Sequence, residues 1–215
     1  MVSPAFAYMA SKTPTPTATR LQVAWCTDGP QAKNARPTNR AAHLDWITTT
    51  GIFELGGPFL NHAGSIEGSL LVANAIDISN LLKEDPYAKA GVFEKTEIRS
   101  WTKGAVKNKS GSDLGDDTNW FIVWCIDRKG MLETRKKTRA SHLEWWKESA
   151  RHGWIGPFVG EDGQSEGSMI VCEGESIDEI AKWAETDPYK KEDLFEEVRI
   201  REFKKVVEHF EIIKS

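Results

Sequence analysis

Two histidines occupy the same place in two copies of one motif. The pattern Arg-x3-Arg-x2-His-Leu-acid-Trp begins at Arg36 and returns at Arg135, so that His142 follows His43 by 99 residues. An imidazole titrates near neutral pH and can therefore both accept and donate a proton. A lone histidine on a helix is usually structural, but recurrence within a shared motif leaves the structural and the functional interpretation both open. We therefore take His43 and His142 as candidate general acid/base residues.

The repeat extends well beyond this motif. An offset of 99 residues also relates Trp25-Cys26-x-Asp28 to Trp124-Cys125-x-Asp127, Gly57-Pro58-Phe59 to Gly156-Pro157-Phe158, and Glu67-Gly68-Ser69 to Glu166-Gly167-Ser168. Further along, Asp85-Pro86-Tyr87 returns as Asp187-Pro188-Tyr189 at an offset of 102. The chain thus contains two homologous halves, and the slip of three predicts one loop or helix end of different length.

The repeat sets the domain limits at 20–103 and 119–207, with a linker at 104–118 and a tail at 208–215. Residues 1–19 contain no acidic residue and are rich in Ser, Thr and Ala, which predicts a disordered leader. Ser3-Pro-Ala-Phe-Ala within it resembles a plastid cleavage pattern, while a plain flexible terminus explains it equally well. A cytoplasmic and a plastid location therefore both stay open.

Each half predicts the element order β-α-β-β-α-β, which is the ferredoxin-like split unit. Asp85 comes directly before a proline, which favours a helix end or turn from which a carboxylate can point into a cleft. The predicted strands span 21–27, 52–60, 67–75 and 92–101, then 120–127, 154–160, 167–173 and 194–206; the predicted helices span 36–51, 77–82, 138–153 and 176–185.

Composition excludes several classes of function. A formal net charge of −4 provides no electrostatic footprint for nucleic acid. No apolar run approaches the roughly 18 residues of a membrane helix, which predicts a soluble protein without membrane insertion. Three cysteines without a Cys-x-x-Cys pair argue against a disulfide framework or a zinc site. Nothing in the sequence calls for a metal or another cofactor.

Taken together and in order, these motifs make each half similar to a YCII-related (YciI-like) domain. The resemblance covers about residues 21–103 and 120–205. It implies an α+β fold in which two ferredoxin-like units pack face to face as a dimeric α/β barrel, here formed within one chain as an intrachain pseudo-dimer. Pairing is also expected physically, because a lone four-stranded sheet with helices on one face leaves its other face bare.

The resemblance further implies a site around a histidine and an aspartate. These correspond to His43 with Asp85, and to His142 with Asp187. A carboxylate fixes the imidazole tautomer and raises its basicity. The candidate substrate-binding residues are Arg40 and Arg139, which could hold an anionic group, together with Asp28, Asp127, Ser69, Ser168, Trp25 and Trp124. Core packing is the competing interpretation of both tryptophans.

Two main functions stay open at this point. One is a cofactor-independent lyase, isomerase or dehydrochlorinase acting on a small aromatic or carbonyl compound, since one known activity in the family is dechlorination of a chlorinated hydroxyhydroquinone. The other is a non-catalytic ligand-binding or assembly subunit with a protein-complex partner. A haem-handling barrel is a third reading by analogy of fold. Because Asp45 is replaced by Glu144 and Thr38 by Lys137, the two sites need not be equivalent.

Overall fold

A computed structural model describes residues 20–74, 77–104 and 118–208. The expected leader at 1–19, linker positions 105–117 and tail positions 209–215 lie outside the described residues. The first half contains β1 (Arg20–Asp28), α1 (Ala32–Thr50), β2 (Phe53–Leu60), β3 (Ile66–Ala73), α2 (Ile78–Leu82), α3 (Pro86–Lys89) and β4 (Phe93–Thr102). The second contains β5 (Trp120–Asp127), α4 (Leu132–Glu148), β6 (Gly153–Val159), β7 (Ser165–Glu173), α5 (Ile177–Ala184), α6 (Pro188–Lys191), β8 (Phe195–Phe203) and β9 (Val207–Glu208).

Both long helices begin earlier than their local start signals indicate. Helix α1 starts at Ala32 rather than Arg36 and carries Pro37 inside it, and α4 starts at Leu132 rather than Thr138. Ala32 is buried against Tyr87 and Val92, so tertiary packing extends α1 toward β1. The slip of three residues in the repeat lies in a helix, because α5 has 8 residues where α2 has 5.

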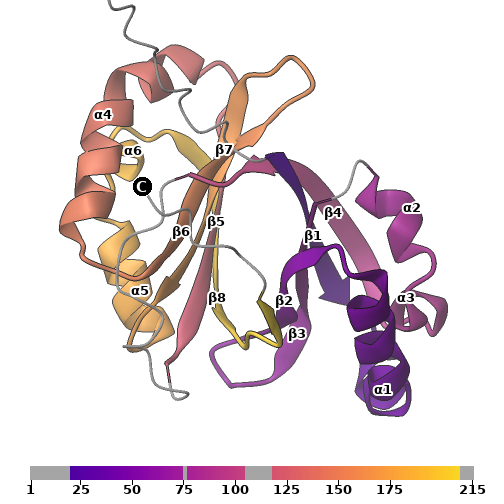
Figure 1. The fold of residues 1–215 in the computed structure, drawn as a ribbon. Coiled ribbons are helices and arrows are strands. Elements are labelled where there is room, and N and C mark those ends of the chain that lie inside the picture. Colours follow the sequence, from indigo (N-terminus) through magenta and orange to yellow (C-terminus); the bar gives the residue numbers. More distant parts are fainter. Residues whose placement is uncertain (1–19, 75–76, 105–117, 209–215) are drawn as a thin grey trace, which may run out of the picture.

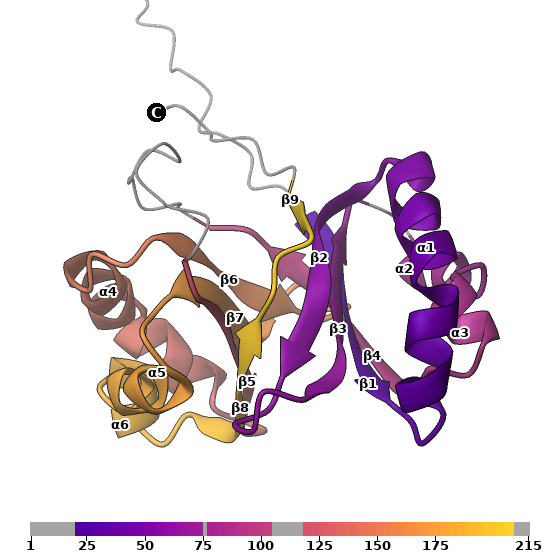
Figure 2. The same ribbon diagram turned by 90° about the horizontal axis from the view of Figure 1, so that it is seen from below.

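The strands of the two halves join into one closed barrel. The orders are β2-β3-β1-β4 and β6-β7-β5-β8, all antiparallel, with β4 pairing with β6 and β8 pairing with β2. The helices lie on the outer flanks, away from the barrel interior (Figures 1 and 2). This is the expected pair of ferredoxin-like units, held in one chain.

The barrel interior is a solid aromatic core. The rings of Trp25 and Trp124 meet edge to face within it, with their centres 5.3 Å apart. Most of the other side chains that fill it are also large and nearly inaccessible: Leu21, Val23, Leu55, Phe59, Leu70, Val72, Trp101, Trp120, Ile122, Trp154, Phe158, Met169, Val171 and Phe203. Separate apolar clusters lie between each sheet and its helices.

Two equivalent glycines let the halves approach closely at the seams. A Cβ on Gly57 would lie 2.0 Å from the carbonyl oxygen of Lys204, and one on Gly156 would lie 1.9 Å from that of Thr102. Contacts this short cannot be relieved by side-chain movement, because the opposing atoms belong to the backbone. The recurrence of Gly-Pro-Phe in the sequence therefore reflects barrel closure.

Reciprocal ion pairs also cross between the halves. Arg99 contacts Glu166 at 2.7 Å, and its counterpart Arg201 contacts Glu67 at 2.9 Å. Between them Arg199 contacts Glu97 at 2.7 Å. Arg199 stands 102 residues after Glu97, so these two are copies of one position that face each other at the pseudo-twofold axis.

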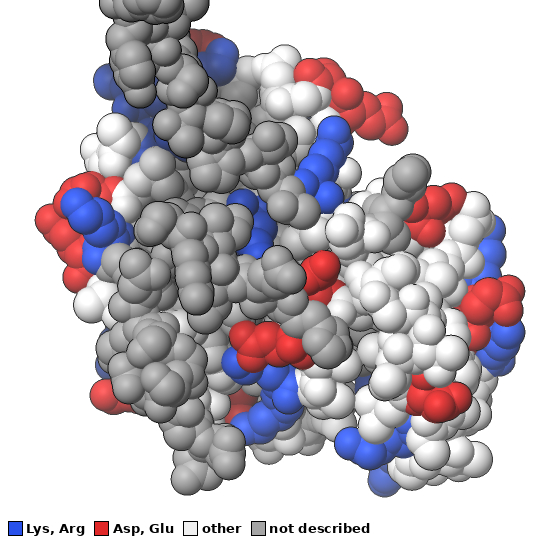
Figure 3. Space-filling model, viewed as in Figure 1, with Lys and Arg blue, Asp and Glu red and all other residues white. Residues whose placement is uncertain are grey.

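Figure 3 shows Lys and Arg interspersed with Asp and Glu on the visible face, with no large area of one sign. This agrees with the small net charge of the chain. No helix in the described ranges combines the length and the apolar character that crossing a bilayer requires.

We expect Glu97→Gln to destabilise the barrel, because it leaves the partly buried Arg199 without its interdomain partner. The free energy of unfolding should fall by about 1–3 kcal/mol in urea denaturation. Glu84→Gln serves as the matched control, since Glu84 forms an exposed pair with Lys89 within one half and should leave stability unchanged. An equal loss of unfolding free energy in both variants would show that the Glu97–Arg199 pair stabilises the barrel no more than an exposed pair does.

Acid should weaken the same contact. Burial raises the pKa of Glu97, but the hydrogen bonds and charges of Arg199 and Arg99 lower it more, so its pKa lies below the ordinary 4.5. A depressed folded-state pKa gives stability that is present above pH 4.5 and lost as pH falls through the folded value. Urea unfolding between about pH 6 and about pH 3 should show a smaller decline for Glu97→Gln than for the parent chain.

Candidate active site

Each candidate histidine is hydrogen-bonded to its expected aspartate. His43 Nδ1 lies 2.7 Å from Asp85 Oδ1, and His142 Nδ1 lies 2.8 Å from Asp187 Oδ1. All four residues are buried; Asp85 is 0% exposed and His43 6% exposed. Because an ionised carboxylate only accepts hydrogen bonds, this contact makes Nδ1 the protonated nitrogen and leaves the Nε2 lone pair available.

Local sequence explains where the aspartates stand. Asp85 is the N-cap of α3 and adopts an extended backbone, as expected for a residue before proline. Its Oδ1 accepts the backbone N–H of Tyr87 at 2.8 Å as well as the histidine proton. Asp187 makes the same contact with Tyr189 at 2.9 Å in the second half. One carboxylate oxygen thus both caps a helix and orients the imidazole.

A tyrosine packs flat on each imidazole. The rings of His43 and Tyr87 are 3.9 Å apart at 14°, and those of His142 and Tyr189 are 4.0 Å apart at 23°. Burial raises the pKa of both phenols, and the nearby arginine offsets this only in part. The tyrosines therefore stay protonated near neutral pH and act as packing surfaces for the imidazoles.

An arginine that the sequence interpretation left unassigned organises the other polar residues. Arg36 donates to Asp28 through Nε and Nη2, both at 2.6 Å, and to Ser69 Oγ at 3.0 Å. Its guanidinium also lies 5.0 Å from the centre of the Tyr87 ring. Asp28 and Ser69 are therefore brought together beside the His43 site, and both accept hydrogen bonds from Arg36.

The second half repeats this arrangement with deeper burial. Arg135 donates to Asp127 at 2.8 Å and to Ser168 Oγ at 2.6 Å. Burial raises the pKa of Asp127, and the charge of Arg135 compensates only partly. The signal that could have identified these arginines was their position at the head of the repeated motif, with Asp and Gly-Ser recurring in the same register.

A cavity of about 280 Å³ opens beside His43 in the first half. Arg40 lines it from an exposed position on α1 and, among the residues the structure describes, makes no ion pair. The other residues that line it are Arg36, Pro37, Leu44, Ile47, Gly56, Gly57, Pro58, Ile66, Ser69, Tyr87 and Val206. The site thus combines an imidazole, an available cation and largely apolar walls.

The remaining candidates lie elsewhere or contribute less. Trp25 and Trp124 lie inside the barrel, whereas Ser69 and Ser168 lie on the helix-covered face, so the structure does not bring the tryptophans to either histidine. Arg139 is exposed on α4, and its positive charge contributes to lowering the pKa of Tyr189 against the larger effect of burial.

The three cysteines are buried and remain thiols. Cys26, Cys125 and Cys172 are all buried without a disulfide. Burial raises the pKa of Cys26 and of Cys172 to about 12 and that of Cys125 still further, so all three stay protonated thiols. No cluster of three or more potential ligands for a metal ion occurs within the described ranges.

Comparison with known proteins places this geometry in context. The model of the YCII-related domain matches residues 21–102 and again 119–204. Protein YciI of Escherichia coli O6:H1 is 28% identical over 95 residues, which cover 40% of this chain and 97% of that protein. An uncharacterised protein of Haemophilus influenzae is 25% identical over 96 residues, with 40% and 98% covered.

Among solved structures, a chlorite dismutase shows a similar fold. A mutant chlorite dismutase of Candidatus Nitrospira defluvii superimposes with a TM-score of 0.59 at 9% identity, over 87% of this chain and 91% of that one. That likeness concerns the fold alone. The dehydrochlorinase TftG of Burkholderia phenoliruptrix AC1100, in complex with 2,5-dihydroxybenzoquinone, is 31% identical over 38% of this chain and 89% of its own, with a TM-score of 0.36.

We expect Asp85→Asn to disturb the imidazole tautomer while α3 stays capped, because Asn is also a good N-cap residue. The amide can donate to Nδ1 and so favour the Nε2–H form, which the carboxylate opposes. Ring ¹⁵N chemical shifts report the two tautomers directly, and His142 in the same sample serves as the internal control. An unchanged His43 spectrum in the variant would refute the orienting role of Asp85.

Proposed function

Since the chain belongs to the YCII-related domain family, we propose that it catalyses proton transfer on a small aromatic or carbonyl compound at a His–Asp site. The observation that carries the proposal is the buried 2.7 Å contact between His43 and Asp85 at a cavity that His43 lines. A base with a fixed tautomer beside space for a small molecule is what general acid–base catalysis requires.

The described residues support the following roles. His43 Nε2 takes a proton from a substrate hydroxyl or from a carbon next to a carbonyl. Asp85 accepts the Nδ1–H throughout and stabilises the imidazolium that forms. The same Nε2–H then returns the proton to a neighbouring atom or to a departing group, which gives an isomerisation or an elimination. In the elimination, the bond to the departing group also breaks, and that group leaves with the electron pair of the bond and with the returned proton. Neither route changes the overall oxidation state, so no redox partner enters.

Arg40 supplies the charge that this chemistry uses. Enolate and phenolate intermediates are anionic, and a guanidinium beside the reacting group lowers their free energy. Arg36 is less suited to that task because Asp28 already neutralises it at 2.6 Å. The tyrosine stacked on the imidazole limits ring rotation and thereby keeps Nε2 in one direction.

A second function, ligand binding without turnover, deserves testing beside the first. The barrel interior is packed with side chains, and a further cavity of about 420 Å³ is lined by Trp25, Asp28 and Arg199. A protein that uses only the helix-side cavity could hold or sequester a ligand, or dock a partner there. Binding that saturates in the complete absence of product would select this function.

We expect His43→Ala to lower turnover by about 10²–10⁴-fold, the usual contribution of a general acid/base. Candidate substrates are small phenols, hydroxyquinones and lactones, and 2,5-dihydroxybenzoquinone is a convenient member of the set. Product formation is followed by mass spectrometry, with the double variant His43→Ala/His142→Ala as the blank. Turnover that survives in the double variant would remove both histidines from the mechanism.

A further inference from the structure

The two halves share their polar site residues but differ in the apolar residues around them. The histidine–aspartate pair, the stacked tyrosine and the arginine–aspartate–serine group occur in both halves with closely similar distances. The substitutions of Asp45 by Glu144 and of Thr38 by Lys137 concern exposed positions. The difference that affects ligands therefore lies in the cavity wall.

Two wall positions are filled in the second half. Gly56 and Ile47 line the cavity of the first half, and their counterparts 99 residues later are Ile155 and Trp146. Both counterparts are 3% exposed and belong to one packed cluster between α4 and the sheet. The larger side chains thus occupy the volume that Gly56 and the smaller Ile47 leave to the cavity.

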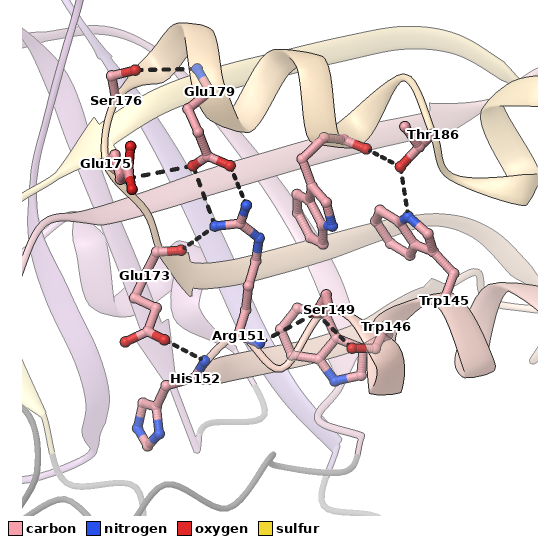
Figure 4. A network of polar contacts seen from close by, with 11 residues as sticks. Trp145, Trp146, Ser149, Arg151, His152, Glu173, Glu175, Ser176, Glu179 and Thr186 are labelled. Atoms are coloured by element: carbon pink, nitrogen blue, oxygen red, sulfur yellow. Dashed lines mark hydrogen bonds and ion pairs between the residues drawn. The ribbon is translucent and has the colours of Figure 1, made fainter.

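Further aromatic and ionic contacts surround Trp146. Trp145 stacks on Trp183 at 4.3 Å, and Trp183 lies in the lengthened helix α5. Arg151 ties this layer together by its ion pair with Glu179 and its position 4.6 Å from the centre of the Trp183 ring. Figure 4 shows the polar part of this network between α4 and α5.

At the rim of the cavity, the larger apolar side chains belong to the first half. Ile66 and Val206 line the cavity of the first half, and each is 46% exposed. They are two of only three large hydrophobic side chains with such exposure in the described part of the chain. The counterpart of Ile66 is Ser165. The counterpart of Val206 is Gly104. The two residues make equivalent hydrogen bonds: the N–H of Val206 donates to the carbonyl of Gly56, and the N–H of Gly104 donates to the carbonyl of Ile155.

We propose that the chain binds one ligand, in the first half only, and that this ligand is a small aromatic anion. Its ring lies between α1 and Gly56, covered by Ile66 and Val206, with its charged group against Arg40. A volume of about 280 Å³ is at the lower end for a ligand pocket and suits a single ring. At the equivalent position of the second half the polar residues recur, but Ile155 and Trp146 replace the smaller wall residues and the apolar rim is missing. The cavity of about 500 Å³ in that half lies beside α5, α6 and β8; Asp187 lines it, and His142 does not.

This inference rests on the proposed function only in placing the ligand at the His43 site. It does not depend on proton transfer there. Benzoate and phenylacetate serve as anionic probes, with benzyl alcohol as the neutral control. We expect calorimetry to give one equivalent per chain and NMR to show amide shifts at Gly56, Gly57 and Ile47. Arg40→Gln removes the positive charge and should lower the affinity for both anions about tenfold, which corresponds to about 1.4 kcal/mol. The affinity for benzyl alcohol should stay unchanged.

The double variant Gly56→Ile/Ile47→Trp copies the wall of the second half into the first and should weaken probe binding at least about tenfold. A Cβ at Gly56 meets the flexible end of Leu71 at 3.1 Å, so Gly56→Ala is a milder second variant with a smaller effect in the same direction. Ile155→Val is the matched control in the other half and should leave affinity unchanged.

Three results would overturn the inference: two equivalents bound per chain, shifts around Gly156 and His142, or no binding of either anion beside His43. A failure of the proposed function looks different. In that case the probes bind the first half with the expected stoichiometry, yet no substrate shows turnover that depends on His43.

Discussion

Closure of the barrel is the constraint on which the other features depend. Each half has helices on one face of its sheet and large apolar side chains on the other, and only the opposite half can cover that second face. The close approach at Gly57 and Gly156 is therefore obligatory. It also shapes the site, because the segment that crosses Gly57 continues to Val206, which bonds to Gly56 and forms part of the cavity wall. The second half thus helps to build the cavity of the first.

Gene duplication explains how the two halves could come to differ. In a symmetric pair of identical units, a residue on the twofold axis faces its own copy, and like charges there would repel. Within one chain the two copies can change separately, and here they are Glu97 and Arg199, which attract. The same freedom allowed Gly56 and Ile155 to diverge. One loss of symmetry thus has two consequences. It gives a charge pair between the halves, and it gives the first half its cavity beside His43.

Sequence repeats predicted the halves and the location of the length difference, because a repeat preserves register across the whole fold. They also predicted the element order, apart from the short helices α3 and α6 and the strand β9. The predicted starts of the two long helices were wrong, whereas those of α2 and α5 agree within one residue. Ala32 is held in α1 by contacts with distant residues rather than by a local signal. The sequence interpretation gave Arg40 a role and left Arg36 unassigned, and Arg36 makes the contacts that organise Asp28 and Ser69. A motif shows that both arginines recur, but only the strand positions opposite the helix decide which one reaches them.

The tryptophans also show what the sequence alone could not decide. Alternation along β1 puts Trp25 and Cys26 on opposite faces, yet which face holds the site depends on where α1 packs. The structure places the imidazoles between helix and sheet, where Asp85 can cap a short helix and orient His43 with one oxygen. This coupling explains why Asp-Pro-Tyr recurs as a unit: the aspartate accepts both hydrogen bonds, the proline starts the helix, and the tyrosine supports the imidazole ring. Substituting any of the three would disturb the direction of Nε2, so the chemistry of the site and the local fold cannot vary independently.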